Sequence, residues 1–197
     1  MRLRLIIVTL LSIILCNSIN AQNFQENFQG KKYKITKTGM TVLGSWALGN
    51  IAANALMLPS AHGDDKYFKQ MNIYWNLVNI AIAGGGYVAN EQYRKKSLST
   101  YQLISDQYKT EKVLLLNAGL DLVYITAGQL LKERAKNISK NPDRLKGFGN
   151  GLILQGVFLF VFDLSLHTIH IRHRNKNNAH FSQINLSINS DGLRMYF

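Results

Sequence analysis

The sequence predicts an all-α integral membrane protein: a four-transmembrane-helix bundle followed by a short C-terminal β-hairpin. Its 197 residues suit a single domain, and the hydrophobic fraction of 47% is ordinary. The apolar residues are nevertheless concentrated in four segments that hold at most one charged residue each. Each segment reaches the roughly 20 residues that a helix needs to cross the hydrocarbon core. The predicted spans are about 39–58, 70–90, 113–131 and 147–171.

Residues 1–21 predict a secretory signal sequence ahead of this bundle. Two arginines open the chain, an apolar core follows, and Ala21 is a small residue at the expected cleavage point. The only cysteine, Cys16, lies within this segment. Cleavage would therefore leave no thiol for a disulfide, a zinc ligand or a nucleophile. A polar N-terminal segment, 22–38, would lead into the first span.

Local signals indicate where the helices begin and end. Pro59 ends the first span, because proline disfavours helix at the residue before it. Ser99 with Gln102 is typical of a capping box, so the third helix should begin well outside the membrane. Asn141 followed by Pro142 is a favoured helix start, with the asparagine as cap.

The last segment, 172–197, is a basic tail that ends in the predicted β-hairpin. Apolar residues alternate from Ile184 to Ile188, and they alternate again after Asp191-Gly192. Asp-Gly between two alternating runs favours a tight hairpin turn. We expect this hairpin to lie outside the bilayer.

The net charge of +12 comes from lysines and arginines that gather next to the ends of the spans. This placement favours anchoring at an anionic lipid surface over nucleic-acid binding, because no separate basic domain exists. We expect a multi-pass protein of the bacterial inner membrane. A cleaved signal would leave 13 basic residues in the outer connections against 8 in the inner ones, which conflicts with the positive-inside rule. We still favour the cleaved-signal topology, with residue 22 outside, because the rule is statistical and the connection 132–146, with six basic residues, favours the inside.

Polar residues in the spans repeat at helical spacing. At 100° per residue, Asn72, Asn76 and Asn79 share one narrow stripe of their helix. In lipid, helices associate through small residues and hydrogen bonds between them, so we expect such stripes to face inward and to pair across the bundle. The alternative is a polar cavity that binds a ligand or moves protons. The candidate residues are Asn50, Asn54, Asn72, Asn76, Asn79, Asn117, Asp121, Tyr124, Asp163 and His167.

Asp121 and Asp163 are the two carboxylates within spans. A charge at mid-span costs about 2.5–3.5 kcal/mol on insertion scales, so such residues are usually paired, protonated or functional. His167 follows Asp163 by one helical turn, and the two could relay protons. A structural hydrogen bond between the third and fourth helices is the other interpretation. Adding His170 would give three potential metal ligands, but one helix rarely closes a metal site, so no metal is predicted.

No enzyme signature is present. Gly84–Gly86 lacks the Lys-Ser/Thr of a phosphate-binding loop, and no cofactor is predicted. The favoured function is a non-enzymatic membrane protein that binds a partner or small ligand through its polar-lined bundle. One alternative is a small transporter or proton-coupled channel that uses the intramembrane Asp and His residues. A second alternative is a soluble secreted helical bundle.

Two segments, "GMTVLGSWALGNI" and "QMNIYWNLVNIAIAG", together with "NAQNF" after the signal, resemble an uncharacterised family of small polytopic proteins from Bacteroidetes-type bacteria. The resemblance covers Gly39 to Ile171 and rests on the spacing of Trp and Asn residues in the first two spans. It implies a four-helix polytopic architecture. The family is a domain of unknown function, so the resemblance implies no activity.

Overall fold

The computed structural model describes residues 2–137 and 140–177, and for 2–22 it describes only the course of the backbone. The predicted all-α architecture is confirmed over these residues, which contain no strand. A 3₁₀ turn, η1 (Leu58–Ser60), follows the first helix. The long helices are α1 (Arg2–Met57), α2 (Gly63–Arg94), α3 (Thr100–Lys136) and α4 (Pro142–Asn175). The predicted C-terminal β-hairpin lies outside the described residues.

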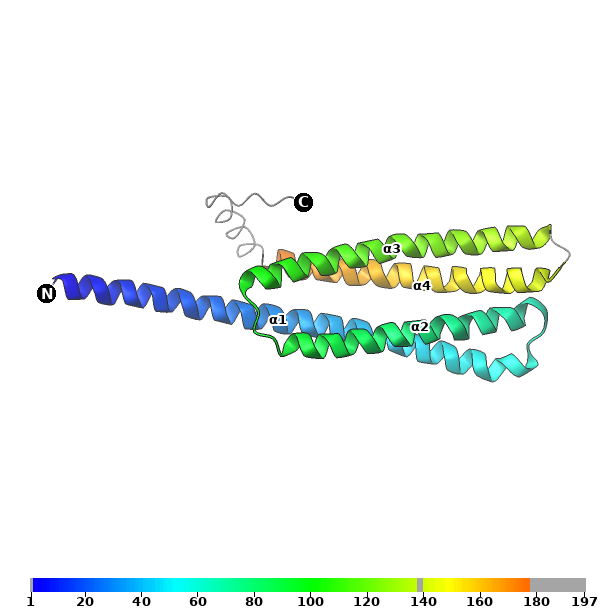
Figure 1. The fold of residues 1–197 in the computed structure, drawn as a ribbon, viewed down its shortest axis with the longest axis horizontal. Helices are drawn as coiled ribbons and strands as arrows, with labels where there is room; N and C mark the ends of the chain where they lie inside the picture. Colours follow the sequence, from blue (N-terminus) through cyan, green and yellow to red (C-terminus); the bar gives the residue numbers. More distant parts are fainter. Residues whose placement is uncertain (1, 138–139, 178–197) are drawn as a thin grey trace.

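The four described helices run alternately up and down along one long axis (Figure 1). α1 and α2 form one hairpin, and α3 and α4 form the other. α4 packs against both α3 and α2, whereas α1 packs chiefly against α2. α2 and α3 make little contact, so the bundle is open along one side. The N-terminal part of α1 extends past the end of the other helices (Figure 1).

Two of the three local signals predicted for the starts of α3 and α4 are confirmed. Ser99 caps α3 in a capping box with Gln102, as predicted. Pro142 occupies the start of α4, also as predicted. The predicted Asn141 cap is wrong: its side chain makes no capping hydrogen bond, and the residue takes a left-handed conformation with φ of 57°. The chain reverses direction here, and asparagine tolerates this backbone region better than most residues.

Glycines on two faces of α4 allow its close packing. Gly147 and Gly151 approach α2, where a Cβ on Gly151 would lie 2.8 Å from Met71 Cγ. Gly149 and Gly156 approach α3, and a Cβ on Gly149 would lie 2.6 Å from the carbonyl oxygen of Gly128. Small residues at such contacts let helix backbones come together in lipid, where no hydrophobic force drives helices together.

The outer surface of the bundle is apolar. Within the part of the chain described, three helical segments are long and apolar enough to cross a membrane: Asn23–Ser60, Thr100–Lys136 and Pro142–Asn175. α2, which contains the predicted 70–90 span, does not meet that test. Leu116 and Leu130 of α3 are each 65% exposed, although leucine is usually buried in water-soluble proteins.

The segment 22–38 is helical and packs against the rest of the protein. Phe24 and Phe28 are buried with Leu103 and Ile104 of α3 in an apolar cluster. At about 1.5 Å per residue, the 37-residue α3 is roughly 55 Å long, whereas the hydrocarbon core is about 30 Å thick. The bundle is therefore longer than a bilayer core, and this cluster occupies the end formed by the beginning of α3.

Candidate functional site

A cavity of about 540 Å³ lies among the four helices. It opens along the side where α2 and α3 make little contact. Apolar side chains that line the cavity and are also exposed on the outer surface mark this opening: Val78, Ile82, Val113 and Leu120. The rim between these residues is as apolar as the surrounding surface, and the exposed Lys109 lines the cavity nearer the beginning of α3.

Asp121 of α3 and Asp163 of α4 line this cavity, and both are buried. The two helices pack against each other, and both residues face the same cavity. We call these two residues the carboxyl pair. Asp121 Oδ2 is buried and has no hydrogen-bond partner among the described residues. One acceptor of the pair is therefore still free.

Trp75 of α2 and Tyr124 of α3 form the aromatic part of the cavity wall. Their rings meet edge to face, with centroids 4.8 Å apart and an interplanar angle of 78°. Trp75 Nε1 is buried, and no acceptor among the described residues reaches it. The cavity thus has an unsatisfied donor as well as an unsatisfied acceptor.

The asparagine stripe of α2 faces inward. Asn72, Asn76 and Asn79 are all buried. The expected pairing across the bundle is found for Asn72, whose Oδ1 accepts from Gln155 of α4, whereas the NH2 groups of all three bond within α2. Asn72 and Asn76 donate to the carbonyl oxygens of Phe68 and Asn72, at 2.9 and 2.8 Å, and Asn79 donates to Asn76 Oδ1 at 3.2 Å. The short asparagine side chain reaches its own preceding turn more easily than a neighbouring helix.

Gln155 of α4, which the sequence analysis missed, makes the link across the bundle. It is fully buried, donates to Asn72 Oδ1 at 2.6 Å, and accepts from Trp46 Nε1 at 3.2 Å. Trp46 also stacks on Phe158 of α4, with ring centroids 3.8 Å apart. One amide therefore connects α1, α2 and α4. Its isolation among apolar residues in 151–162 was the available signal.

Five of the ten predicted interior residues line the cavity: Asn79, Asn117, Asp121, Tyr124 and Asp163. The others lie elsewhere. Asn50 and Asn54 of α1 donate to the carbonyl oxygens of Trp46 and Asn50, at 3.0 and 2.8 Å. These two asparagines stabilise their own helix and bring no group to the carboxyl pair.

The Nδ1 of His167 bonds to a group other than Asp163. That nitrogen lies 3.0 Å from the backbone oxygen of Glu111, to which it must donate. The bond joins α4 to α3 outside the cavity lining. Within the described residues, no group of three or more His, Cys, Asp or Glu side chains could hold a metal ion.

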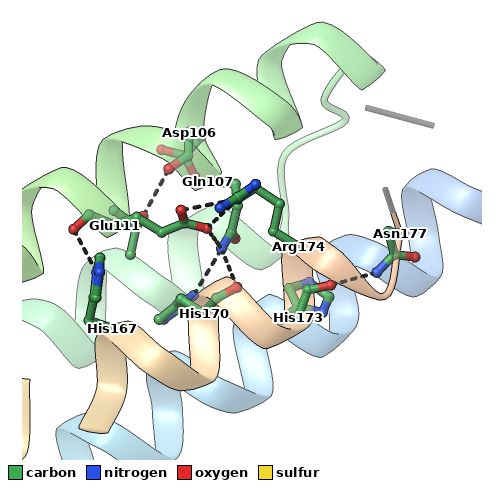
Figure 2. Close-up of polar contacts among 9 residues, drawn as sticks. Asp106, Gln107, Glu111, His167, His170, His173, Arg174 and Asn177 are labelled. Carbon is green, nitrogen blue, oxygen red and sulfur yellow. Dashed lines mark hydrogen bonds and ion pairs between the residues drawn. The ribbon is translucent and has the colours of Figure 1, made fainter. Parts of the chain in front are cut away.

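A second polar cluster lies where α3 begins and α4 ends (Figure 2). Arg174 Nε donates to both oxygens of Glu111 at 3.1 Å. Gln107 Nε2 donates to Glu111 Oε1 at 2.9 Å and to the backbone oxygen of His170 at 3.0 Å. Glu111 and Gln107 are buried, so this ion pair is held in place by hydrogen bonds. Sequence analysis missed Gln107, Glu111 and Arg174 because they lie outside the predicted spans.

α1 joins the same end of the bundle through Lys32. Its ammonium lies 2.5 Å from Asp106 Oδ2 of α3 and 5.2 Å from the ring centroid of Tyr93. Burial raises the pKa of Tyr93 above its usual range. These contacts hold the beginning of α3 against the N-terminal half of α1.

Comparison with known families places the chain in context. Residues 42–164 match a family of unknown function, DUF6992. The chain belongs to DUF6992. Comparison with curated proteins and with solved structures finds no match.

The part of the chain that matches DUF6992 contains the carboxyl pair, the asparagine stripe and Gln155. It includes Glu111 but ends before His167 and Arg174. The interhelical cavity is therefore built mainly from the DUF6992 region. The polar cluster at the end of the bundle joins that region to the segments on either side of it.

Proposed function

We propose that this DUF6992 protein is a polytopic, non-enzymatic membrane protein that binds a small amphiphilic ligand in the cavity among its helices. Two unsatisfied polar atoms, Asp121 Oδ2 and Trp75 Nε1, carry the proposal. Both belong to residues that line one mostly apolar cavity. A buried polar group without a partner costs about 1–3 kcal/mol, and a ligand with matching groups would remove that cost.

The cavity limits the chemistry of this ligand. Its volume of about 540 Å³ suits a molecule of drug size. An ammonium or hydroxyl group would donate to Asp121, and the apolar body would contact the residues around it. Because the rim between α2 and α3 is apolar, the ligand would enter from the lipid.

The membrane location has independent support in the surface of the bundle. Large exposed apolar areas are rare on soluble monomers, and exposed leucines and valines are frequent on α3. α1 ends at the opposite end of the bundle from the start of α3 (Figure 1). If both cross the bilayer in the same direction, α2 must cross back, which makes 70–90 the fourth span. Release by carbonate extraction would instead favour a soluble secreted bundle.

We further propose a bacterial inner-membrane location and cleavage of the signal 1–21 after Ala21. The buried Phe24 follows this point, so cleavage would leave the apolar cluster with Leu103 intact. Intact-mass measurement of the purified protein tests the cleavage. A mass that still includes the first 21 residues would refute it.

The binding experiment uses 1-adamantylamine as a probe, because it combines an apolar cage with one ammonium group. Its matched control is adamantane-1-carboxylate, which has the same cage and the opposite charge. We expect the amine to bind the detergent-solubilised protein in calorimetric titration and the carboxylate not to bind. Binding of both probes with equal affinity would overturn the proposed role of Asp121.

Two substitutions on α3 give the structural control. Asn117 lines the cavity, and Asn117→Phe should block binding of the amine. Leu116→Phe adds a ring to a side chain that is outside the cavity lining and exposed, so it should leave binding unchanged. Equal effects of the two substitutions would place the probe outside the cavity and contradict the proposal.

The presence of two buried carboxyl groups, Asp121 and Asp163, in one cavity favours a second candidate, a proton-coupled transporter or channel. Intramembrane carboxyl groups are common in proton pathways. Reconstituted protein should then dissipate a proton gradient in vesicles. The Asp163→Asn variant should fold but lose the flux. Vesicles that hold their gradient equally well with and without the protein would exclude this candidate.

A further inference from the structure

A second cavity, of about 480 Å³, lies between α1 and α4 at the end of the bundle that contains the Glu111–Arg174 pair. Three basic residues line it: Lys31 of α1, and Arg172 and Lys176 of α4 with its C-terminal turn. All three are exposed. None forms an ion pair with a carboxylate of the described residues, unlike Lys32, which is paired with Asp106. The cavity therefore gathers positive charge that no described acid neutralises.

His173 adds a buried polar atom to the same cavity. The residue is 7% exposed, and its Nε2 is buried without a partner among the described residues. Phe28 stacks on its ring, with centroids 4.3 Å apart and an interplanar angle of 28°, which fixes the orientation of the imidazole. A buried polar nitrogen is costly unless something bonds to it, so this atom points to an occupant with a hydrogen-bonding group.

Two aliphatic residues of the cavity, Ile35 and Ile169, lie on its membrane side. Ile35 is one helical turn from Lys31 toward the first span, and Ile169 is one turn from His173 toward the interior of α4. Basic groups thus lie above apolar groups at the level where a helix leaves the hydrocarbon core. This layering matches a phospholipid, whose charged head group is joined to acyl chains.

We propose that this cavity binds the phosphate group of one anionic phospholipid, with Lys31, Arg172 and Lys176 around the phosphate and Ile35 and Ile169 along the acyl chains. His173 Nε2 supplies the remaining hydrogen bond to the head group. The proposal rests on the membrane location argued above, but it is independent of the interhelical cavity and of its ligand.

Native mass spectrometry of the full chain tests the site. The protein is released from nanodiscs made of phosphatidylglycerol or of phosphatidylcholine, and lipid that stays bound is counted. We expect one phosphatidylglycerol to be retained and phosphatidylcholine to be lost. Equal retention of both lipids would show a non-selective lipid belt and overturn the proposal.

Charge-matched variants locate the lipid. Lys31→Gln with Arg172→Gln should weaken retention of phosphatidylglycerol about 30-fold, since two cations near the head group are lost. Lys95→Gln with Lys96→Gln removes the same charge from exposed positions at the same end of the bundle, and it should leave retention unchanged. All four side chains are exposed, so neither variant should disturb folding. An equal loss in both variants would refute the site.

Inorganic phosphate distinguishes a lipid from a free anion as the source of the phosphate group. An excess of inorganic phosphate should fail to displace bound phosphatidylglycerol, because it lacks the acyl chains that contact the two isoleucines. Tight binding of inorganic phosphate without retention of phosphatidylglycerol would overturn the lipid assignment. Binding of 1-adamantylamine should be unchanged in the Lys31 and Arg172 variant, which separates this test from that of the interhelical cavity.

Discussion

Gly149→Ala should destabilise the bundle by separating α3 from α4. A Cβ at this position would lie 2.6 Å from the carbonyl oxygen of Gly128, 2.8 Å from Lys132 Cγ and 3.3 Å from Leu131 Cβ. The lysine side chain can rotate away from the new methyl group. The carbonyl oxygen of Gly128 belongs to the helix backbone, so it can move only if the two helices move apart.

The expected magnitude follows from a matched substitution. Overpacking of this kind costs about 1–3 kcal/mol, while alanine gains about 1 kcal/mol over glycine in helix propensity. Gly119→Ala on α3 shares that propensity gain, because nothing lies within 4 Å of its added Cβ. The propensity term therefore cancels in the comparison. Gly149→Ala should be less stable than Gly119→Ala by about 1–3 kcal/mol.

Unfolding by SDS in mixed micelles, followed by circular dichroism, measures this difference. The free energy of unfolding should be lower for Gly149→Ala than for Gly119→Ala. Equal free energies for the two variants would mean that α3 and α4 do not meet at Gly149. The close packing of α3 against α4, which brings the carboxyl pair to one cavity, would then be refuted as well.

Three further predictions concern buried and surface polar contacts. Asn76→Leu removes two hydrogen bonds and should lower the free energy of unfolding by about 1–3 kcal/mol. Leu77→Ala changes an exposed side chain of the same helix and should lower it little. Equal thermal stability of the two variants would contradict the buried stripe. Gln155→Leu should cost a similar amount and shift tryptophan fluorescence, and an unchanged spectrum would count against its indole bond. A hydrogen bond from Tyr33 lowers the pKa of Glu91 below 4.5, so its contribution to stability is present above that pH and lost as pH falls through the lower value. Tyr33→Phe should flatten this acid limb of the stability curve, and an unchanged limb would exclude the bond.

The helices, and the inward direction of their polar faces, could be predicted from local sequence. The Ser99 capping box depends on residues three apart and on nothing elsewhere in the chain. Asn72, Asn76 and Asn79 share a face because a helix turns 100° per residue, and the cost of amides in lipid turns that face inward. Both arguments need only one helix and its solvent.

The hydrogen-bond partners and neighbours of the polar groups could not be predicted in this way. Asp121 and Asp163 each stand out as intramembrane carboxylates, yet their placement in one cavity depends on how far α3 and α4 are shifted along each other. Gly149 and Gly156 set that shift by close backbone approach. Gln155 was missed because a single amide has no periodic pattern, and its two partners lie on two different helices.

By itself, the sequence determined that the chain forms long apolar helices with polar stripes facing inward, because those properties follow from residue periodicity and from the cost of polar groups in lipid. Only the tertiary structure decided which stripes meet, that the bundle opens between α2 and α3, and that the basic residues around His173 surround one cavity. The physical reason is that helix rotation and axial shift are set by contacts between residues far apart in the chain. Such contacts depend on shape and distance, which no single segment encodes.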